Sequence, residues 1–183
     1  MKKRILVSQI IAIAVIILAK PAGWTLFIAG AGFMALGQLI RILASSAIVK
    51  SKTLTVTGPY AAVRNPLYLG TAFMMLGLMI ALSNPQAPVR TALAWIAASV
   101  SFIAIYRVQI KAEEEFLLSV YGAEFERYKA RVNAIIPRPA DLRGFFDSSA
   151  YSYEVFRKNK EWRGFIGMAA AAAIVAARIK YGI

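Results

Sequence analysis

The sequence predicts an all-α, polytopic membrane protein with four or five transmembrane helices and several short cytoplasmic or interfacial helices. Of the 183 residues, 59% are hydrophobic, well above the ~45–50% of an ordinary soluble domain, and the mean hydropathy is +0.59. The apolar residues are gathered into long runs separated by polar turns, which is the pattern of helices that cross a bilayer. The length suits a single domain, 1–183.

The charged residues, and the residue types that are absent, limit the partners and the chemistry that this chain can have. The formal net charge of +13 could indicate a nucleic-acid partner, but the cations lie between apolar runs and not along a soluble basic face. Membrane lipids with anionic headgroups are therefore the expected partner, and nucleic acid is not. Without cysteine or histidine the chain lacks thiolate nucleophiles and the commonest general base and metal ligand. A metal site would need carboxylates alone, and none is predicted.

Five apolar segments are candidate spans, although the first is shorter than the ~20 residues usually needed. They cover residues 5–19, 24–49, 67–82, 91–110 and 164–181. The segment 5–19 follows three cations and imitates a signal peptide, but residues 20–23 lack a small-x-small cleavage site. We therefore expect an uncleaved helix followed by a tight hairpin. The Ala-rich segment 164–181 has the weakest pattern of the five.

The second candidate span carries a polar stripe. At 1.5 Å per residue it would be roughly 39 Å long, more than the ~30 Å hydrocarbon core, so it must tilt or project. Gln38, Arg41 and Ser45 share one face of this helix. Either the stripe faces a substrate or cofactor cavity, or Arg41 extends to the inner interface. The sequence favours the interface.

The polar segments between and after the spans are expected on one side of the membrane. Segments 50–66 and 111–139 are predicted to be cytoplasmic, facing the compartment where soluble nucleotide-like cofactors reside, with short helices near 111–121 and 123–132. Segment 140–163 mixes aromatic and basic side chains, as interfacial segments do, and its aromatics are expected to be membrane anchors. Four helices before residue 107 would put most cations and the amino terminus on one side, the cytoplasmic side of a bacterial-type inner or plasma membrane.

One polar and aromatic stretch, residues 57–70, organises the first hundred residues. Its sequence is T-G-P-Y-A-A-V-R-N-P-L-Y-L-G. The dipeptides Gly58-Pro59 and Asn65-Pro66 favour turns, so Tyr60, Arg64 and Tyr68 should be oriented by turns. Irregular backbone beside a bilayer is tolerated only where it is buried in protein or lines a wet cavity.

A second chemically rich stretch follows the fourth candidate span. Glu113, Glu114 and Glu115 would point 100° apart on a helix, so at most two can serve one site. The alternative is a solvated helix start, where acids are favoured. The positions that follow are Leu117, Tyr121-Gly122, Glu124-Phe125, Tyr128, Arg131-Val132 and Ile136-Pro137.

The first stretch resembles the G-P-Y-x-x-V-R-H-P-x-Y-x-G signature of the membrane-embedded isoprenylcysteine carboxyl methyltransferases and phospholipid N-methyltransferases. Every fixed position matches except the histidine, which is Asn65 here. The second stretch is similar to the family's E-E-x-x-L, aromatic-Gly, E-Y-x-x-Y and Ile-Pro elements, with Phe125 in place of a tyrosine. This alignment pairs Glu113 and Glu114 with the family's carboxylates and leaves Glu115 variable. We call the two stretches, residues 57–70 and 113–137, the first and the second sequence block. Together they cover roughly 57–137.

The resemblance implies an S-adenosylmethionine-dependent methyltransferase that releases S-adenosylhomocysteine. Arg64 would bind the methionine carboxylate of the cofactor and Glu114 or Glu113 its ammonium group, with Arg64 and Glu114 as the catalytic residues. Aromatic and apolar side chains would enclose the adenine, and Gly58 and Gly70 would allow close approach. The full expected cofactor set is Gly58, Tyr60, Arg64, Asn65, Pro66, Tyr68, Gly70, Glu113, Glu114, Leu117 and Tyr128.

The resemblance also implies in-line methyl transfer to a lipophilic or amphiphilic acceptor that enters from the bilayer. Such a reaction needs alignment and a dry site more than proton chemistry, so the lack of histidine is no obstacle. Because Asn65 cannot titrate near pH 7, in an active protein it would position the cofactor.

Several alternatives stay open. A phospholipid or lipid-like amine is the preferred acceptor, ahead of a prenylated carboxylate or a small thiol. An NADPH-dependent, sterol-reductase-like enzyme and a non-catalytic lipid-binding protein, in which Asn65 marks lost activity, are the rival functions.

Overall fold

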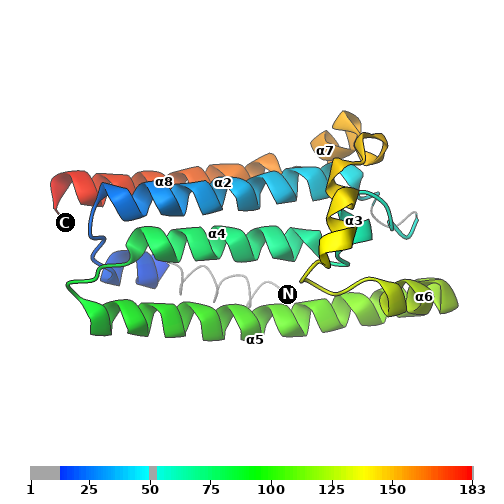
Figure 1. Ribbon diagram of the computed structural model, residues 1–183, viewed down its shortest axis with the longest axis horizontal. Coiled ribbons are helices and arrows are strands. Elements are labelled where there is room, and N and C mark those ends of the chain that lie inside the picture. Colours follow the sequence, from blue (N-terminus) through cyan, green and yellow to red (C-terminus); the bar gives the residue numbers. More distant parts are fainter. Residues whose placement is uncertain (1–12, 50–52, 183) are drawn as a thin grey trace. The chain divides into compact units, whose positions relative to one another are not determined.

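The computed structural model describes residues 13–49 and 53–182, and every regular element in these ranges is helical (Figure 1). Residues 13–18 form the first helical segment. The further elements are α2 (Trp24–Ala47), α3 (Pro59–Ala62), α4 (Pro66–Leu82), α5 (Pro88–Tyr121), α6 (Ala123–Arg131), the 3-10 helices η1 (Pro139–Phe146) and η2 (Ser148–Ala150), α7 (Tyr153–Asn159) and α8 (Trp162–Tyr181). The predicted all-α class is confirmed.

Three helices of the described ranges are long and apolar enough to cross a membrane, namely α2, α5 and α8. Helix α4 is apolar but shorter, with 17 residues. Most of the predicted span 5–19 lies outside the described residues. The architecture is that of the predicted polytopic membrane protein.

Helix α5 differs from the sequence prediction, which separated a span at 91–110 from a short helix at 111–121. The structure has one helix of 34 residues, roughly 51 Å long. No glycine or proline follows Pro88 before the helix ends, so the change from apolar to charged residues near Lys111 does not interrupt the backbone. The helix ends at Gly122, whose φ of 47° suits a residue without a Cβ. The carboxylates of the second sequence block therefore lie near the carboxyl-terminal end of this helix.

The described chain divides into two compact units. Unit 1 contains residues 13–35, 73–109 and 165–182, and unit 2 contains residues 36–49, 53–72 and 110–164. All residues of both sequence blocks belong to unit 2.

Unit 1 is held together by small residues and an apolar core. Ile16, Ala19, Ala81, Leu82 and Val175 form that core. The backbones of α2 and α4 approach closely at Gly30 and Gly77, because a Cβ on Gly77 would meet the carbonyl oxygen of Gly30 and come within 2.6 Å of the backbone nitrogen of Met34. Small residues allow such close packing where lipid removes the usual hydrophobic driving force.

Unit 2 packs the first sequence block against the end of α2. Tyr60 of α3 contacts Ala44 and Ala47, and Tyr151 joins the same cluster. The Tyr151 hydroxyl donates to the Phe145 carbonyl at 2.6 Å. Tyr151, one of the aromatics of 145–162 that are predicted to be membrane anchors, is thus half-buried and packs against the core of this unit.

Helix α3 also packs against η1 (Figure 1). A Cβ on Gly144 of η1 would lie 2.6 Å from the carbonyl oxygen of Gly58. Because glycine leaves this space free, the backbone of η1 lies directly against the start of the first sequence block.

Candidate active site

The first sequence block is attached to the segment after α6 by paired backbone hydrogen bonds. The Arg64 amide donates to the Asn133 carbonyl at 2.8 Å, and the Asn65 amide donates to the Ala134 carbonyl at 3.0 Å. Val63 before them is extended, with φ −146° and ψ 149°. The stretch between α3 and α4 is therefore irregular backbone held by these bonds, and it places the Arg64 side chain within hydrogen-bonding distance of α5 and the end of α6.

The Arg64 side chain joins three parts of unit 2. Its Nε and Nη2 donate to Glu114 Oε1 of α5 at 3.0 and 2.7 Å. Its Nη1 donates to the carbonyl oxygens of Lys129, at 3.2 Å, and Val132 at the end of α6. A cation is favourable there because the last carbonyls of a helix carry partial negative charge. The side chains of Arg64 and Glu114 are only 11% and 13% exposed, so solvent screens this ion pair weakly.

Glu113 and Glu114 both face the first sequence block, whereas Glu115 does not. The second oxygen of Glu114, Oε2, lies 3.1 Å from Lys129 Nζ, and the Tyr68 hydroxyl donates to Glu113 Oε1 at 2.5 Å. Glu115 is 67% exposed and lies 3.9 Å from Lys111, one turn earlier. This division follows from the 100° rotation between successive helical residues.

Asn65 occupies the position of the family histidine and has a structural partner. Its Nδ2 donates to the Ala134 carbonyl at 3.2 Å, a bond that the N–H of a neutral imidazole could also make. Its own carbonyl accepts from the amides of Tyr68 and Leu69, both at 3.1 Å, in the first turn of α4. Pro66 is buried as the first residue of α4, a position that suits its fixed φ.

The two glycines that were expected to allow close approach are each in contact with protein. Gly58 has φ +59°, and a Cβ there would lie 2.8 Å from the Cβ of Ala150. A Cβ on Gly70 would lie 2.5 Å from Arg41 Cγ and 2.6 Å from the Gly37 carbonyl oxygen. Both glycines thus let parts of this chain pack together.

The predicted aromatic walls separate into buried and accessible residues. Tyr60 and Tyr128 are 6% and 8% exposed, and the Tyr128 hydroxyl donates to the Tyr60 carbonyl at 2.6 Å. Burial raises the pKa of both hydroxyls above the ordinary value of a tyrosine. Tyr68 and Leu117 are half-buried. Phe125, which replaces a family tyrosine, is 1% exposed and packs edge-on against Tyr128.

Arg41 is not a cation that simply extends to the interface, as the sequence favoured. Its Nε donates to Glu161 Oε1 at 2.6 Å, and its Nη1 donates to Thr71 Oγ1 at 2.5 Å and to the Leu67 carbonyl at 3.1 Å. Sequence analysis did not single out Glu161. The available signal was Arg41 itself, since an arginine within an apolar helix generally requires an opposite charge.

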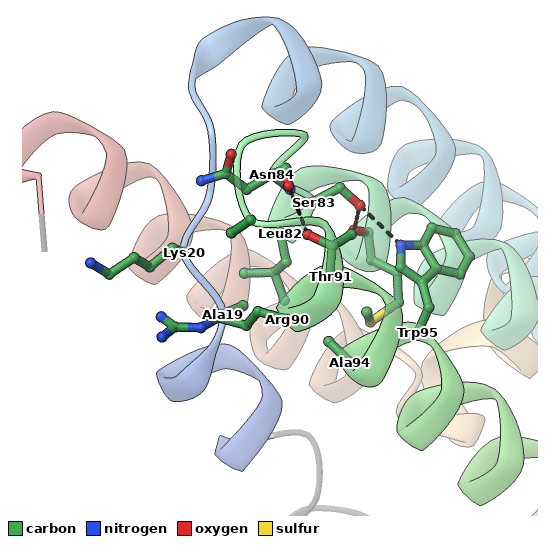
Figure 2. A pocket seen from close by; sticks show the side chains of 11 residues that line it. Ala19, Lys20, Leu82, Ser83, Asn84, Arg90, Thr91, Ala94 and Trp95 are labelled. Atoms are coloured by element: carbon green, nitrogen blue, oxygen red, sulfur yellow. Dashed lines mark hydrogen bonds between the residues drawn. The ribbon is translucent and has the colours of Figure 1, made fainter.

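A depression in unit 1 has a different character (Figure 2). Its lining includes Lys20 and Arg90, whose side chains extend beside one another, and Trp95, whose Nε1 donates to Ser83 Oγ at 3.0 Å. No carboxylate lines it. It therefore lacks a negatively charged group that could pair with the ammonium of the expected cofactor.

This combination of apolar helices with two converging polar blocks defines an integral membrane protein with a candidate site built around an Arg-Glu pair. The chain belongs to the phospholipid methyltransferase family, whose model matches residues 9–124. The match contains the first block and the two carboxylates, and it ends before Tyr128.

Three curated proteins illustrate the similarity. The chain is 32% identical over 125 residues to the cobalt-zinc-cadmium resistance protein CzcN of Cupriavidus metallidurans, covering 68% of this chain and 54% of that protein. It is 31% identical over 118 residues to the protein-S-isoprenylcysteine O-methyltransferases of Schizosaccharomyces pombe and Saccharomyces cerevisiae. These two matches cover 58% and 56% of this chain, and 47% and 45% of the relatives. The chain thus spans about half the length of the curated relatives it matches. No solved structure matches it significantly.

Proposed function

We propose that this chain is an S-adenosylmethionine-dependent methyltransferase that acts on a lipophilic or amphiphilic acceptor at the cytoplasmic face of a membrane. Membership of the phospholipid methyltransferase family supports the proposal. The observation that carries it is the Arg64–Glu114 ion pair, which joins the two sequence blocks in one unit.

The donor set around this pair fits the cofactor. Its ammonium group requires a carboxylate, and Glu113 is an exposed one that is oriented by the Tyr68 hydroxyl. The carboxylate of the cofactor requires a cation, and the Lys129 side chain, which is 53% exposed and lies beside Glu114, could supply it. The Tyr68 ring and Leu117 offer half-buried walls for the adenine.

Arg64 then acts chiefly as a positioning residue. Its three guanidinium nitrogens already have protein partners, so it orients Glu114 and α6 towards the cofactor. Tyr60 and Tyr128 are buried beneath the site, and the Tyr128 hydroxyl fixes the position of α3 by donating to the Tyr60 carbonyl. Asn65 keeps the segment after α6 in place through Ala134.

The bound cofactor would supply a methyl group on a sulfonium centre, which any suitably aligned nucleophile can accept. The protein residues hold the reactants in line and exclude water, and these two effects account for most of the acceleration expected for such a reaction. Phospholipids and isoprenylcysteine, named in the matched family and relatives, both carry long apolar groups. We prefer a lipid-like amine as the acceptor, with a prenylated carboxylate as the alternative.

Calorimetric titration of the detergent-solubilised protein with S-adenosylhomocysteine tests the proposal. We expect saturable binding that is about tenfold weaker for Glu113→Gln, which corresponds to loss of one charged contact of ~1.4 kcal/mol. Glu115→Gln is the matched control, because this neighbour on α5 faces solvent, and it should bind as the wild type does. A folded protein that binds NADPH but not S-adenosylhomocysteine would refute the proposal in favour of a reductase.

A further inference from the structure

Every charged side chain of unit 1 is a cation. The charged residues of its described part are Lys20, Arg90, Arg107, Arg178 and Lys180, and this part contains no aspartate or glutamate. The nine acidic residues of the chain all belong to unit 2. The charge of these cations is therefore not balanced by any side chain of their own unit.

Two of these cations lie together at the depression in unit 1 (Figure 2). Lys20 follows the first helical segment and Arg90 belongs to the first turn of α5; both are exposed, and their side chains extend beside one another. Within residues 13–49 and 53–182 neither side chain makes an ion pair or a hydrogen bond. Like charges that lie side by side repel each other, and an anion between them relieves this repulsion.

The other polar side chains that line the depression already use their oxygen atoms. The Thr91 hydroxyl accepts from the Asn84 amide and donates to the Asn84 carbonyl, both at 3.0 Å. The Ser83 hydroxyl accepts from Trp95 and donates to a carbonyl of α4. The Asn84 Oδ1 accepts from the Gln86 amide at 2.9 Å, which leaves the Asn84 Nδ2 as a donor. The side-chain groups that a ligand could use here are therefore donors.

These donors define the chemistry of the ligand. The planar Arg90 guanidinium can donate two parallel N–H bonds to two oxygens of a phosphate, and the Lys20 ammonium adds a compact charge. The Asn84 amide adds a neutral donor. All three side chains line the same depression, and their polar ends lie at one side of it in Figure 2. The depression is too shallow to enclose a ligand, so a phosphate, which has several oxygens around one centre, would lie on its rim.

Two tryptophans indicate that this end of unit 1 lies at a membrane surface. Trp24, the first residue of α2, is 49% exposed, and Trp95 near the start of α5 lines the depression. Both helices are able to cross a membrane, and tryptophan is enriched where such helices leave the hydrocarbon core. The phosphate groups of phospholipids lie at that level, so the anion that suits these donors is abundant there.

We propose that Lys20, Arg90 and Asn84 form a binding site for a phosphate group, which we call the Lys20–Arg90 site. A bound phosphate would connect the residue after the first helical segment with the start of α5 and so stabilise unit 1. Both sequence blocks belong to unit 2, so this site is separate from the candidate active site and does not depend on the proposed function. The phosphate can come from a phospholipid headgroup or from solution.

Thermal unfolding of the purified full chain in an uncharged detergent tests the site. The protein is titrated separately with phosphatidylglycerol, with sodium phosphate and with sodium chloride, at one ionic strength, and the rise in melting temperature gives the dissociation constant of each. Phosphatidylglycerol is chosen because it carries a phosphate and a net negative charge but no amine, so it is not the methyl acceptor preferred above. We expect it to raise the melting temperature of the wild type saturably, and chloride not to do so.

Two variants locate the effect. Arg90→Gln and Lys20→Gln should each weaken binding about tenfold, which corresponds to the loss of one charge-assisted contact. Arg107→Gln is the matched control, because it removes the same charge from an exposed residue of α5 that does not line the depression, and it should bind as the wild type does. Without added ligand all three variants should melt within about 2 °C of the wild type, as surface substitutions do.

The three titrations also identify the source of the phosphate. Stabilisation by phosphatidylglycerol alone assigns the site to a lipid phosphate, stabilisation by sodium phosphate alone assigns it to free phosphate, and stabilisation by both shows that either source is accepted. The proposal is overturned if neither phosphate compound stabilises the wild type more than chloride does. It is also overturned if the variants of Lys20 and Arg90 bind no more weakly than Arg107→Gln, because the net charge of the chain would then explain the effect.

Discussion

Replacement of Arg64 by methionine should destabilise the protein strongly, because this residue connects three parts of unit 2. The change removes two hydrogen bonds to Glu114 and two to carbonyls at the end of α6. Methionine keeps much of the aliphatic volume, so the loss is mainly electrostatic.

The size of the effect follows from burial. Breaking a buried ion pair by removing one partner costs ~3–5 kcal/mol, because the other charge is left unpaired. Glu114 is 13% exposed but keeps Lys129 at 3.1 Å, so we expect the lower end, about 3 kcal/mol. For a chain of this size the melting temperature should fall by about 6–12 °C.

Thermal unfolding in detergent, followed by circular dichroism, measures this shift. Arg90→Met is the matched control, since Arg90 is exposed in unit 1, and it should melt within about 2 °C of the wild type, as surface substitutions do. If Arg64→Met melts as the control does, the ion pair does not organise unit 2 and the assignment of Arg64 as a positioning residue is wrong.

Three further predictions concern buried contacts. Tyr128→Phe should lower the free energy of unfolding by ~1–2 kcal/mol, because it removes a buried hydrogen bond. Since burial raises the pKa of Tyr128, the stability of the wild type should fall as the pH rises above ~10, and that of the variant should fall less steeply. Unfolding measured between pH 8 and 11 tests both expectations. Gly77→Val should lower the melting temperature through collision with the Gly30 carbonyl, whereas Gly32→Val, at a site open to space, should have little effect; equal shifts would contradict this packing. Gln38→Leu should raise the free energy of unfolding by ~1–3 kcal/mol, because it removes a buried amide that has no hydrogen-bond partner among the described residues; a lower melting temperature than that of the wild type would contradict this.

Much of the fold could be predicted because membrane helices follow from local properties. Apolar runs and turn dipeptides predicted the class, and the start of α4 after Asn65-Pro66 is within one residue of the expected position. The separate helix at 111–121 was a wrong prediction, because a change in polarity does not end a helix unless the backbone is also interrupted. In α5 the interruption comes only at Gly122.

The sequence by itself determined which residues could meet at the candidate site. Helical rotation allows at most two of the three adjacent glutamates to serve one site, the family resemblance selects Glu113 and Glu114, and turns orient the Arg64 region. Only the tertiary structure decided how they are used. It assigned the Arg64 nitrogens to protein partners, placed parts of the chain against Gly58 and Gly70, and paired Arg41 with Glu161, 120 residues away. Such pairings depend on how distant helices pack, and no local pattern encodes them. For the same reason, only the folded chain shows that the buried Gln38 amide and Tyr60 hydroxyl have no hydrogen-bond partner within residues 13–49 and 53–182.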